Sequence, residues 1–168
     1  MATPSGKIEI HSLTIAGFEY DDVLGHPVFH SPIKDHEYPL RLTSPQPGDK
    51  LHSQLQSAIE DHQCFNTVRM HSNDAISRKL QDQDQVLVCN ANGSCLAQVL
   101  ISDEIKQGVV SMATGSWYAP APDGVDISGN PNVLTKDYGT SRLGQGAAAH
   151  NVGVEVKKFQ GSLSPSSH

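Results

Sequence analysis

Apolar and polar residues alternate in short runs along most of the chain. Such runs occur at residues 8–10, 38–43, 67–70, 85–89, 95–101, 108–113 and 151–156. Because a period of two places the apolar side chains on one face of a strand, each run predicts a short β-strand. Several short strands in series predict a mainly β fold, a barrel with one or two short flanking helices.

Turn and capping signals separate the predicted strands. The dipeptide Asn92-Gly93 is typical of a tight hairpin and predicts the turn between two of them. Ser72 or Asn73 predicts the N-cap of a short helix over residues 74–80, because both side chains accept hydrogen bonds from free N–H groups.

Three stretches lack a clear apolar period. Residues 44–49 contain two prolines and a glycine and are typical of a turn-rich loop. Residues 52–62 fit either a short helix or a loop. Gly, Pro, Asn, Ser and Asp dominate residues 114–149. A loop of that length inside a compact domain is usually functional, so the third stretch is a candidate site.

Composition and charge narrow the function classes. The chain has 168 residues, 37% of them hydrophobic and 18% charged, which predicts one domain with a substantial core. The formal net charge of −6 argues against a nucleic-acid partner, which needs a basic patch. It leaves room for a small anionic ligand held by backbone N–H groups. Since no apolar stretch is long enough to cross a bilayer, we expect no membrane partner.

Several chemical motifs fail their structural context. Residues 144–149 match G-x-G-x-x-A but have no strand before them and no helix after them. No C-x-x-C pair occurs, so Cys64, Cys89 and Cys95 are expected to be reduced packing residues. The chain also has no G-x-S-x-G motif, the nucleophile elbow of serine hydrolases. The histidines at positions 26, 30 and 36 lack the spacing of metal ligands and are expected at the surface.

Two polar segments stand out as candidate ligand sites. Residues 43–54 open from a strand end into a dense set of hydroxyl, amide and imidazole groups, and residues 129–146 are rich in Asn, Thr, Ser and Gly. Asn and Gln amides offer a donor and an acceptor each, which suits the edge of a heterocycle. Glycines let backbone N–H groups approach a phosphate. The alternative is a pair of ordinary turns that satisfy their own hydrogen bonds.

The two segments resemble the molybdopterin-guanine-dinucleotide-binding C-terminal domain of the dimethyl-sulfoxide reductase family, in its biotin sulfoxide and trimethylamine-N-oxide reductase branch. The most specific motifs are Leu-His-Ser-Gln-Leu at residues 51–55 and Gly-Asn-Pro-Asn-Val-Leu-Thr at residues 129–135. The resemblance covers nearly the whole chain. It implies a double-psi β-barrel that binds a pair of pterin dinucleotides, bis-MGD, whose dithiolenes chelate one molybdenum. The metal ligand would come from an earlier, missing part of the enzyme, so no residue here is expected to hold metal.

The resemblance also implies a set of cofactor-binding residues. They are Thr43, Ser44, Gln46, His52, Ser53, Gln54, Asn130, Asn132, Gln145 and Gly146, and no catalytic residue is expected among them. The chain departs from the family in the turn at residues 79–85, which lacks the usual glycines. It also lacks the usual acidic residue near Tyr118. These departures concern local stability more than the ligand loops.

The resemblance implies a bacterial protein whose isolated chain is inactive and whose partners are the remaining domains of a parent S- or N-oxide reductase, in the periplasm or the cytoplasm. We expect residues 1–36 to be a lead-in from a preceding domain, 37–159 the binding barrel and 160–168 a disordered tail. Met1-Ala2 before a stretch typical of mid-protein sequence predicts a chain started at a chosen boundary. Two alternatives stay open: a stand-alone pterin or nucleotide carrier subunit, and an unrelated β-barrel hydrolase.

Overall fold

A computed structural model describes residues 2–30, 36–48, 51–54, 66–137, 139–147 and 152–161. The chain divides into two compact units. The first, which we call the lead-in unit, comprises Met1–Ile33 and Asp137–Ala148. The second, the barrel unit, comprises Lys34–Lys136 and Ala149–His168.

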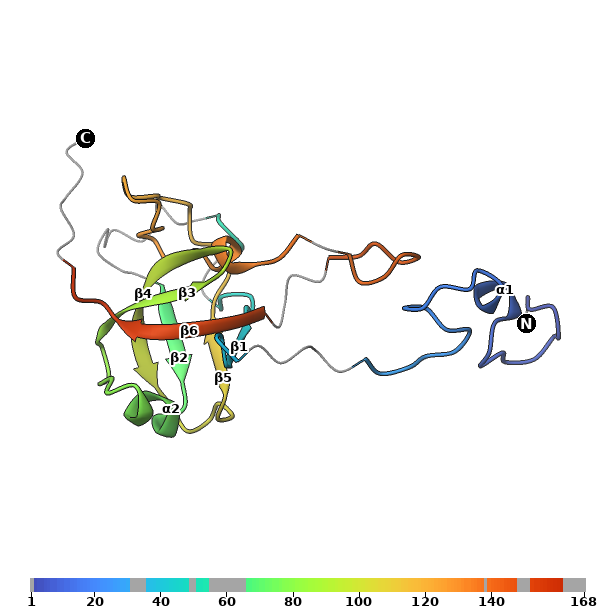
Figure 1. Ribbon diagram of the computed structural model, residues 1–168, viewed down its shortest axis with the longest axis horizontal. Coiled ribbons are helices and arrows are strands. Elements are labelled where there is room, and N and C mark those ends of the chain that lie inside the picture. The colour runs from blue at the N-terminus through green and yellow to red at the C-terminus, as the bar shows by residue number, and fades with distance from the viewer. Residues whose placement is uncertain are drawn as a thin grey trace. The chain divides into compact units, whose positions relative to one another are not determined.

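The barrel unit is built on six strands that close on themselves (Figure 1). They are β1 (Leu40–Thr43), β2 (Thr67–Met70), β3 (Gln85–Asn90), β4 (Gly93–Ile101), β5 (Val109–Met112) and β6 (Val152–Lys158). Around the barrel the order is β1-β5-β2-β4-β3-β6, and β6 pairs with β1 to complete it. The β1–β5 and β2–β4 pairs are parallel and the other four pairs are antiparallel. The mainly β barrel predicted from the alternation is confirmed.

Alternate residues of every strand fill the barrel interior. In β6, for example, Val152, Val154 and Val156 are buried while the residues between them are half-buried. Cross-strand register brings such positions together, as in the pairing of Val88 with both Cys95 and Val156. This alternation is what a closed barrel requires, because each strand has one face toward the interior.

Three local predictions from the sequence are wrong. Residues 8–10 form no strand, and Ile8 and Ile10 are 76% and 78% exposed. Helix α2 (Ser72–Ser77) is capped by the side chain of His71, which accepts from the N–H of Asn73 at 3.0 Å. An imidazole with a free ring nitrogen serves as well as the expected hydroxyl or amide.

The third correction concerns the β3–β4 hairpin. Asn90 pairs with Gly93, so the two turn residues are Ala91 and Asn92 instead of Asn92-Gly93. Gly93 has another role: a Cβ there would lie 2.7 Å from the carbonyl oxygen of Val133. The glycine therefore lets a segment of the long polar loop pass close over the barrel wall.

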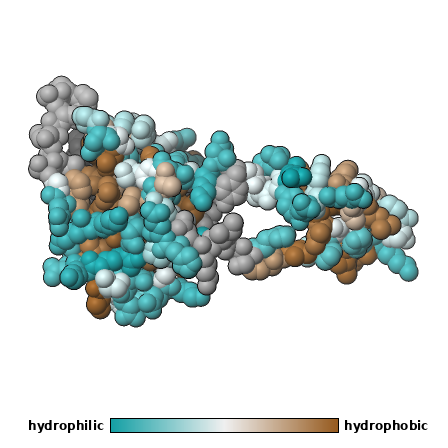
Figure 2. Space-filling view, viewed as in Figure 1, coloured by the Kyte–Doolittle hydropathy of each residue, from teal (hydrophilic) through white to brown (hydrophobic). Residues whose placement is uncertain are grey.

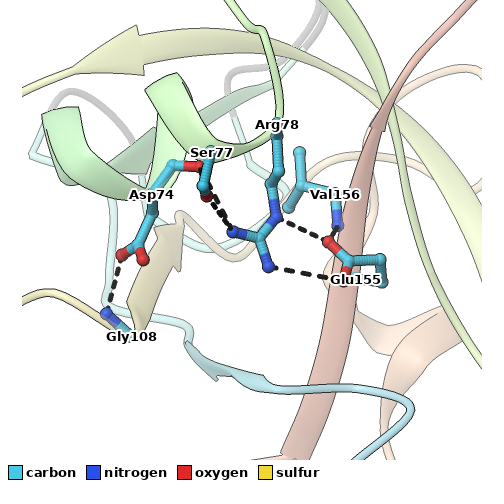
Figure 3. A network of polar contacts seen from close by, with 6 residues as sticks. All are labelled: Asp74, Ser77, Arg78, Gly108, Glu155 and Val156. Atoms are coloured by element: carbon cyan, nitrogen blue, oxygen red, sulfur yellow. Dashed lines mark hydrogen bonds and ion pairs between the residues drawn. The ribbon is translucent and has the colours of Figure 1, made fainter.

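Helix α2 is joined to β6 by an ion pair (Figure 3). Arg78 donates from Nε to Oε1 of Glu155 at 2.6 Å and from Nη2 to Oε2 at 3.3 Å, and both side chains are only about one-fifth exposed. Nearby, the buried carboxylate of Asp74 accepts from the N–H of Gly108 at 2.7 Å. The helix is thus fixed both to the last strand and to the residue before β5.

We expect Arg78→Ala to lower the free energy of unfolding by about 2 kcal/mol, because Glu155 would keep a largely desolvated charge without its partner. Urea unfolding measures this loss. Arg69→Ala is the matched control, since the Arg69–Glu104 pair spans 3.7 Å and is well exposed, and its loss should cost no more than about 0.5 kcal/mol. Equal losses in the two variants would contradict the expectation.

The turn before β3, which lacks the glycines usual in the resembled family, uses ordinary residues in a left-handed conformation. Lys79 has φ 56° and Gln83 has φ 68°. For a residue with a Cβ this region costs roughly 1–2 kcal/mol. The departure noted in the sequence therefore corresponds to local backbone strain.

We expect Gln83→Gly to raise the free energy of unfolding by about 0.5 kcal/mol, because relief of the left-handed conformation exceeds the added entropy of the unfolded chain. Thermal unfolding checks the sign. Gln81, in the same turn but not at positive φ, is the control, and Gln81→Gly should instead be destabilising. A loss in both variants would show that the turn is unstrained.

In the lead-in unit, a short helix, α1 (Leu13–Ala16), begins after Ser12, whose side chain caps it. The loop at residues 139–147 is held by Arg142, whose N–H donates to Asp22 at 2.9 Å and whose guanidinium lies over the Tyr20 ring. Apolar residues are prominent on the surface of this unit (Figure 2), and Phe29 is 85% exposed. No helix among the described residues has the length and apolar character to span a bilayer.

Candidate functional site

Two loops that follow β1 and β5 lie against each other. The N–H of Thr114 donates to the carbonyl of Pro45 at 3.0 Å, and the indole N–H of Trp117 donates to the carbonyl of Ser53 at 2.8 Å. Between these bonds, Gly115 has φ +97° and faces the carbonyl oxygen of His52 so closely that a Cβ would collide with it. The parallel pairing of β1 with β5 brings the two loops out side by side.

A 3₁₀ helix, η2 (Pro131–Leu134), forms the next part of the site. Pro131 stands in its first turn, where a fixed φ costs nothing and no N–H is needed. The side chain of Asn130 caps the helix by accepting from the N–H of Asn132 at 3.0 Å. Leu134 is fully buried in the barrel core, and its carbonyl accepts from Asn90 at 2.7 Å. Proline, cap and buried leucine together fix where Asn130 and Asn132 stand.

The loops and η2 border an open cavity of about 490 Å³. It is lined by His52, Ser53, Thr114, Gly115, Ser116, Trp117, Tyr118, Asn130 and Asn132. The volume lies within the range typical of small-molecule sites. Four of the ten residues expected at the cofactor, two from each polar segment, meet here.

The other expected residues of the barrel unit lie close to these loops. Thr43 and Ser44 line a second, more apolar cavity of about 520 Å³ together with Arg69 and Glu104. The amide nitrogen of Gln46 approaches the His52 ring at 2.9 Å, so Gln46 orients that imidazole. Gln54 is exposed, and its N–H closes a turn onto the carbonyl of Leu51 at 3.0 Å.

Gln145 and Gly146 belong to the lead-in unit, whereas the other eight expected residues belong to the barrel unit. Within that unit the amide nitrogen of Gln145 donates to the carbonyls of Ser141 and Arg142 at 3.0 Å and 3.2 Å. The carbonyl of Gly146 accepts from the N–H of Thr140 at 2.7 Å. Both residues therefore shape their own loop.

The cavity lining described by the structure is polar and uncharged. Its residues supply hydroxyls, amides, one imidazole and two aromatic rings, and none of these described residues is Asp, Glu, Lys or Arg. Among the residues the structure describes, no group of three His, Cys, Asp or Glu side chains could hold a metal ion. The site can bind and orient a polar ligand through hydrogen bonds.

Several residues of the site were not expected from the sequence. Residues 114–118 supply five of the nine described lining residues, whereas the sequence predicted a site only for the whole stretch 114–149 and singled out none of the five. Asn66 donates from its amide to the carbonyls of Ala113 at 2.7 Å and Gly129 at 2.9 Å, which ties the two ends of the cavity segment together. Asp126 is fully buried beneath the same segment. Single polar residues of this kind carry no sequence signal that separates them from ordinary loop residues.

Desolvation inside the barrel wall shifts one titratable group near the site. Burial, together with the nearby carboxylate of Asp126, raises the pKa of the Cys95 thiol to about 12. Cys89 on β3 is half-buried and also free of a disulfide. Cys64 lies outside the described residues. The expected packing role of cysteine therefore fits Cys95, whose thiol stays protonated at neutral pH.

Residues 40–153 match the family of the molydopterin dinucleotide binding domain. The chain belongs to this family. The matched range begins at β1 and ends within β6, so it spans all six strands of the barrel and both loops of the cavity. A pterin dinucleotide is thereby the cofactor of this domain, and the hydrolase alternative falls away.

Similar curated proteins are bacterial oxidoreductases. The chain is 39% identical to trimethylamine-N-oxide reductase 1 of Escherichia coli (strain K12), over 97% of this chain and 21% of that protein. It is 38% identical to biotin sulfoxide reductase of Cereibacter sphaeroides, over 95% of this chain and 23% of that protein. The dimethyl sulfoxide/trimethylamine N-oxide reductase of Rhodobacter capsulatus is 36% identical over 96% of the chain. The chain thus spans about a fifth of the length of these relatives.

A solved structure shares the fold. Acetylene hydratase from Pelobacter acetylenicus superposes with a TM-score of 0.71 at 22% identity, over 95% of this chain and 24% of that one. Together with the closed six-stranded order, this likeness confirms the double-psi β-barrel expected from the sequence. The resemblance to the dimethyl-sulfoxide reductase family is confirmed as well.

Proposed function

We propose that this domain serves a molybdenum S- or N-oxide reductase and that the cavity beside η2 holds part of its molybdopterin guanine dinucleotide. The observation that carries the proposal is the meeting of His52 and Ser53 with Asn130 and Asn132 in one cavity. These residues come from the two segments whose motifs are the most specific in the sequence. Their convergence is what a shared ligand requires.

The chemistry of the cavity fits a guanine or pterin ring with its neighbouring phosphate. Both heterocycles present alternating donors and acceptors along one edge, which amide side chains match. Trp117 and Tyr118 are 55% and 60% exposed and offer aromatic faces to a flat ring. No carboxylate is among the described residues that line the cavity, so none of them repels an anionic pyrophosphate. The volume suits one half of a dinucleotide, so the remainder would extend beyond it.

The rest of the expected set stays part of this proposal. Thr43, Ser44, Gln46 and Gln54 would continue the contact along the loop after β1, and the family resemblance predicts Gln145 and Gly146 as further cofactor-binding residues. The bound cofactor would supply the oxidation–reduction chemistry, while the residues of this chain bind and orient it. We likewise propose residues 37–159 as the binding barrel, with 1–36 leading in from a preceding domain of the same enzyme.

Direct binding tests the proposal. The chain has one tryptophan, Trp117, and it lines the cavity, so quenching of its fluorescence reports occupancy. Guanosine diphosphate should quench it saturably, and inorganic phosphate at equal concentration should not. Assayed with a reduced dye and several S- and N-oxides, the purified chain should show no turnover. Absence of saturable quenching, or turnover with bound molybdenum, would overturn the proposal.

In the longer reductase, Asn132→Ala should lower the content of pterin and molybdenum by about tenfold. The Asn132 side chain makes no hydrogen bond within the described part of the chain, so its amide is available to a ligand. A buried ligand group left unpaired costs roughly 1–3 kcal/mol. Released pterin and metal are quantified against Asn73→Ala, an exposed amide residue on α2, which should keep the normal content. Normal cofactor content in Asn132→Ala would mean that the loop is only structural.

A further inference from the structure

Asp126 is a fully buried carboxylate in the middle of the long polar segment. Burial of an ionised carboxylate is costly unless its oxygens accept hydrogen bonds or face a cation. Among the described residues, none of the ion pairs includes Asp126. Neutral donors must therefore compensate the charge, and their identity shows what the residue holds in place.

The donors come from three points along the same segment. Oδ1 of Asp126 accepts from the N–H of Ala119 at 2.8 Å, and Oδ2 accepts from the N–H of Asn130 at 2.6 Å. The Ser128 hydroxyl lies 3.1 Å and 3.2 Å from the two oxygens and also contacts the backbone carbonyl of Trp117. One carboxylate thus connects both sides of the cavity, the aromatic wall and the start of η2.

The backbone of Asp126 is itself fixed to the barrel. Its N–H donates to the carbonyl of Ser94 at 3.0 Å, and its carbonyl accepts from the N–H of Leu96 at 2.8 Å. Both partners lie on β4, one of the long strands of the barrel wall. The carboxylate is therefore a fixed point, and the segments bonded to it take their positions from the barrel.

We propose that Asp126 is the positioning residue of the cofactor cavity, which sets the distance between the Trp117 wall and the Asn130 cap. The residue does not line the cavity and acts through Ala119, Ser128 and Asn130. The part of this proposal that concerns ligand affinity rests on the proposed function. The part that concerns the ligand-free cavity does not, because acrylamide quenching of Trp117 fluorescence measures the accessibility of that side chain without any ligand.

The chain offers a matched control in Asp74. It is the other buried aspartate among the described residues, at 6% exposure, and its carboxylate accepts from the N–H of Gly108. Asp74 lies on α2 and contributes nothing to the cavity lining. At position 126 Asn keeps the shape but must turn its NH₂ group toward one of two N–H donors, whereas at position 74 it loses the charge and can keep its oxygen on the N–H of Gly108. Any effect specific to Asp126→Asn therefore reflects its position.

The experiment compares Asp126→Asn, Asp74→Asn and the unaltered 168-residue chain. Unfolding by urea reports stability, acrylamide quenching reports the accessibility of Trp117, and titration with guanosine diphosphate reports affinity. Both variants should lose stability. Only Asp126→Asn should make Trp117 more accessible and weaken nucleotide affinity, by about tenfold for one charge-assisted bond. A wild-type quenching constant in folded Asp126→Asn would overturn the proposal.

Two further outcomes are decided in advance. If Asp126→Asn does not fold, Ser128→Ala keeps the carboxylate and removes the hydroxyl through which it reaches the backbone carbonyl of Trp117. Increased Trp117 accessibility in that variant supports the proposal, and unchanged accessibility overturns it. If the unaltered chain does not bind guanosine diphosphate, the proposed function is contradicted. Acrylamide quenching of the ligand-free chains still decides whether Asp126 positions the cavity.

Discussion

Gly115→Ala is expected to lower the free energy of unfolding by about 3 kcal/mol. The residue has φ +97°, which L-amino acids rarely adopt, and its missing Cβ would collide with the backbone carbonyl of His52. Because the obstacle is backbone, no side-chain rotation relieves it. The loops after β1 and β5 would have to separate, and the Trp117–Ser53 hydrogen bond would be lost with them.

Gly124→Ala separates the two causes of that effect. Gly124 also has positive φ, at +86°, but nothing lies within 4 Å of the position of its Cβ. Gly124→Ala should therefore lower the free energy of unfolding only by the cost of the left-handed backbone conformation, roughly 1–2 kcal/mol. Urea unfolding of both variants gives the difference, and guanosine diphosphate binding should fail in Gly115→Ala alone. Equal losses of stability would show that the two loops are not in close contact in solution.

Leu134→Ala should lower the free energy of unfolding by about 2–5 kcal/mol, as large-to-small substitutions in well-packed cores do. Leu134 is fully buried and is the residue by which η2 packs into the barrel core. Its loss should therefore also free Asn130 and Asn132 from their fixed positions. At temperatures where the variant is still folded, its affinity for guanosine diphosphate should be lower than that of the unaltered chain.

Leu80→Ala is the control for this second effect. Leu80 is 5% exposed and belongs to the same core, but it follows α2, which lies at the other end of the barrel from η2 (Figure 1). It should destabilise the chain comparably and leave nucleotide affinity unchanged. If both leucine variants lose affinity in proportion to stability, η2 does not act as a separate support of the site.

The barrel strands could be predicted from the sequence because their signal is local. In β6 and β2, each buried residue is apolar and the residues next to it in sequence are not. The two strands are therefore visible in the sequence as a period of two. The failure at residues 8–10 has the same root. Ile8 and Ile10 alternate with Glu9, but no neighbouring strand completes a ladder, and three residues cannot form a sheet alone.

The candidate site could be predicted only where several polar residues form a motif. His52 and Ser53, and Asn130 and Asn132, lie in such motifs, and the fold brings them to one cavity. Trp117 and Asp126 lie in a segment whose path is set by long-range contacts, with Ser53 and β4 respectively. Contacts between residues far apart in sequence leave no periodic trace, and the same applies to the positive φ of Gly115.

The order of strands around the barrel bears on how the protein folds during synthesis. Strand β1 is the first to leave the ribosome, yet its neighbours are β5 and β6, and Leu40 pairs with Val154. Until residues 152–158 emerge, the barrel stays open and the edges of β1 and β3 that face β6 have no partner. Pairing between such distant segments is slow, and open strand edges invite aggregation. A nascent chain of this domain is therefore a natural client for a chaperone that shields apolar strands until the last one arrives.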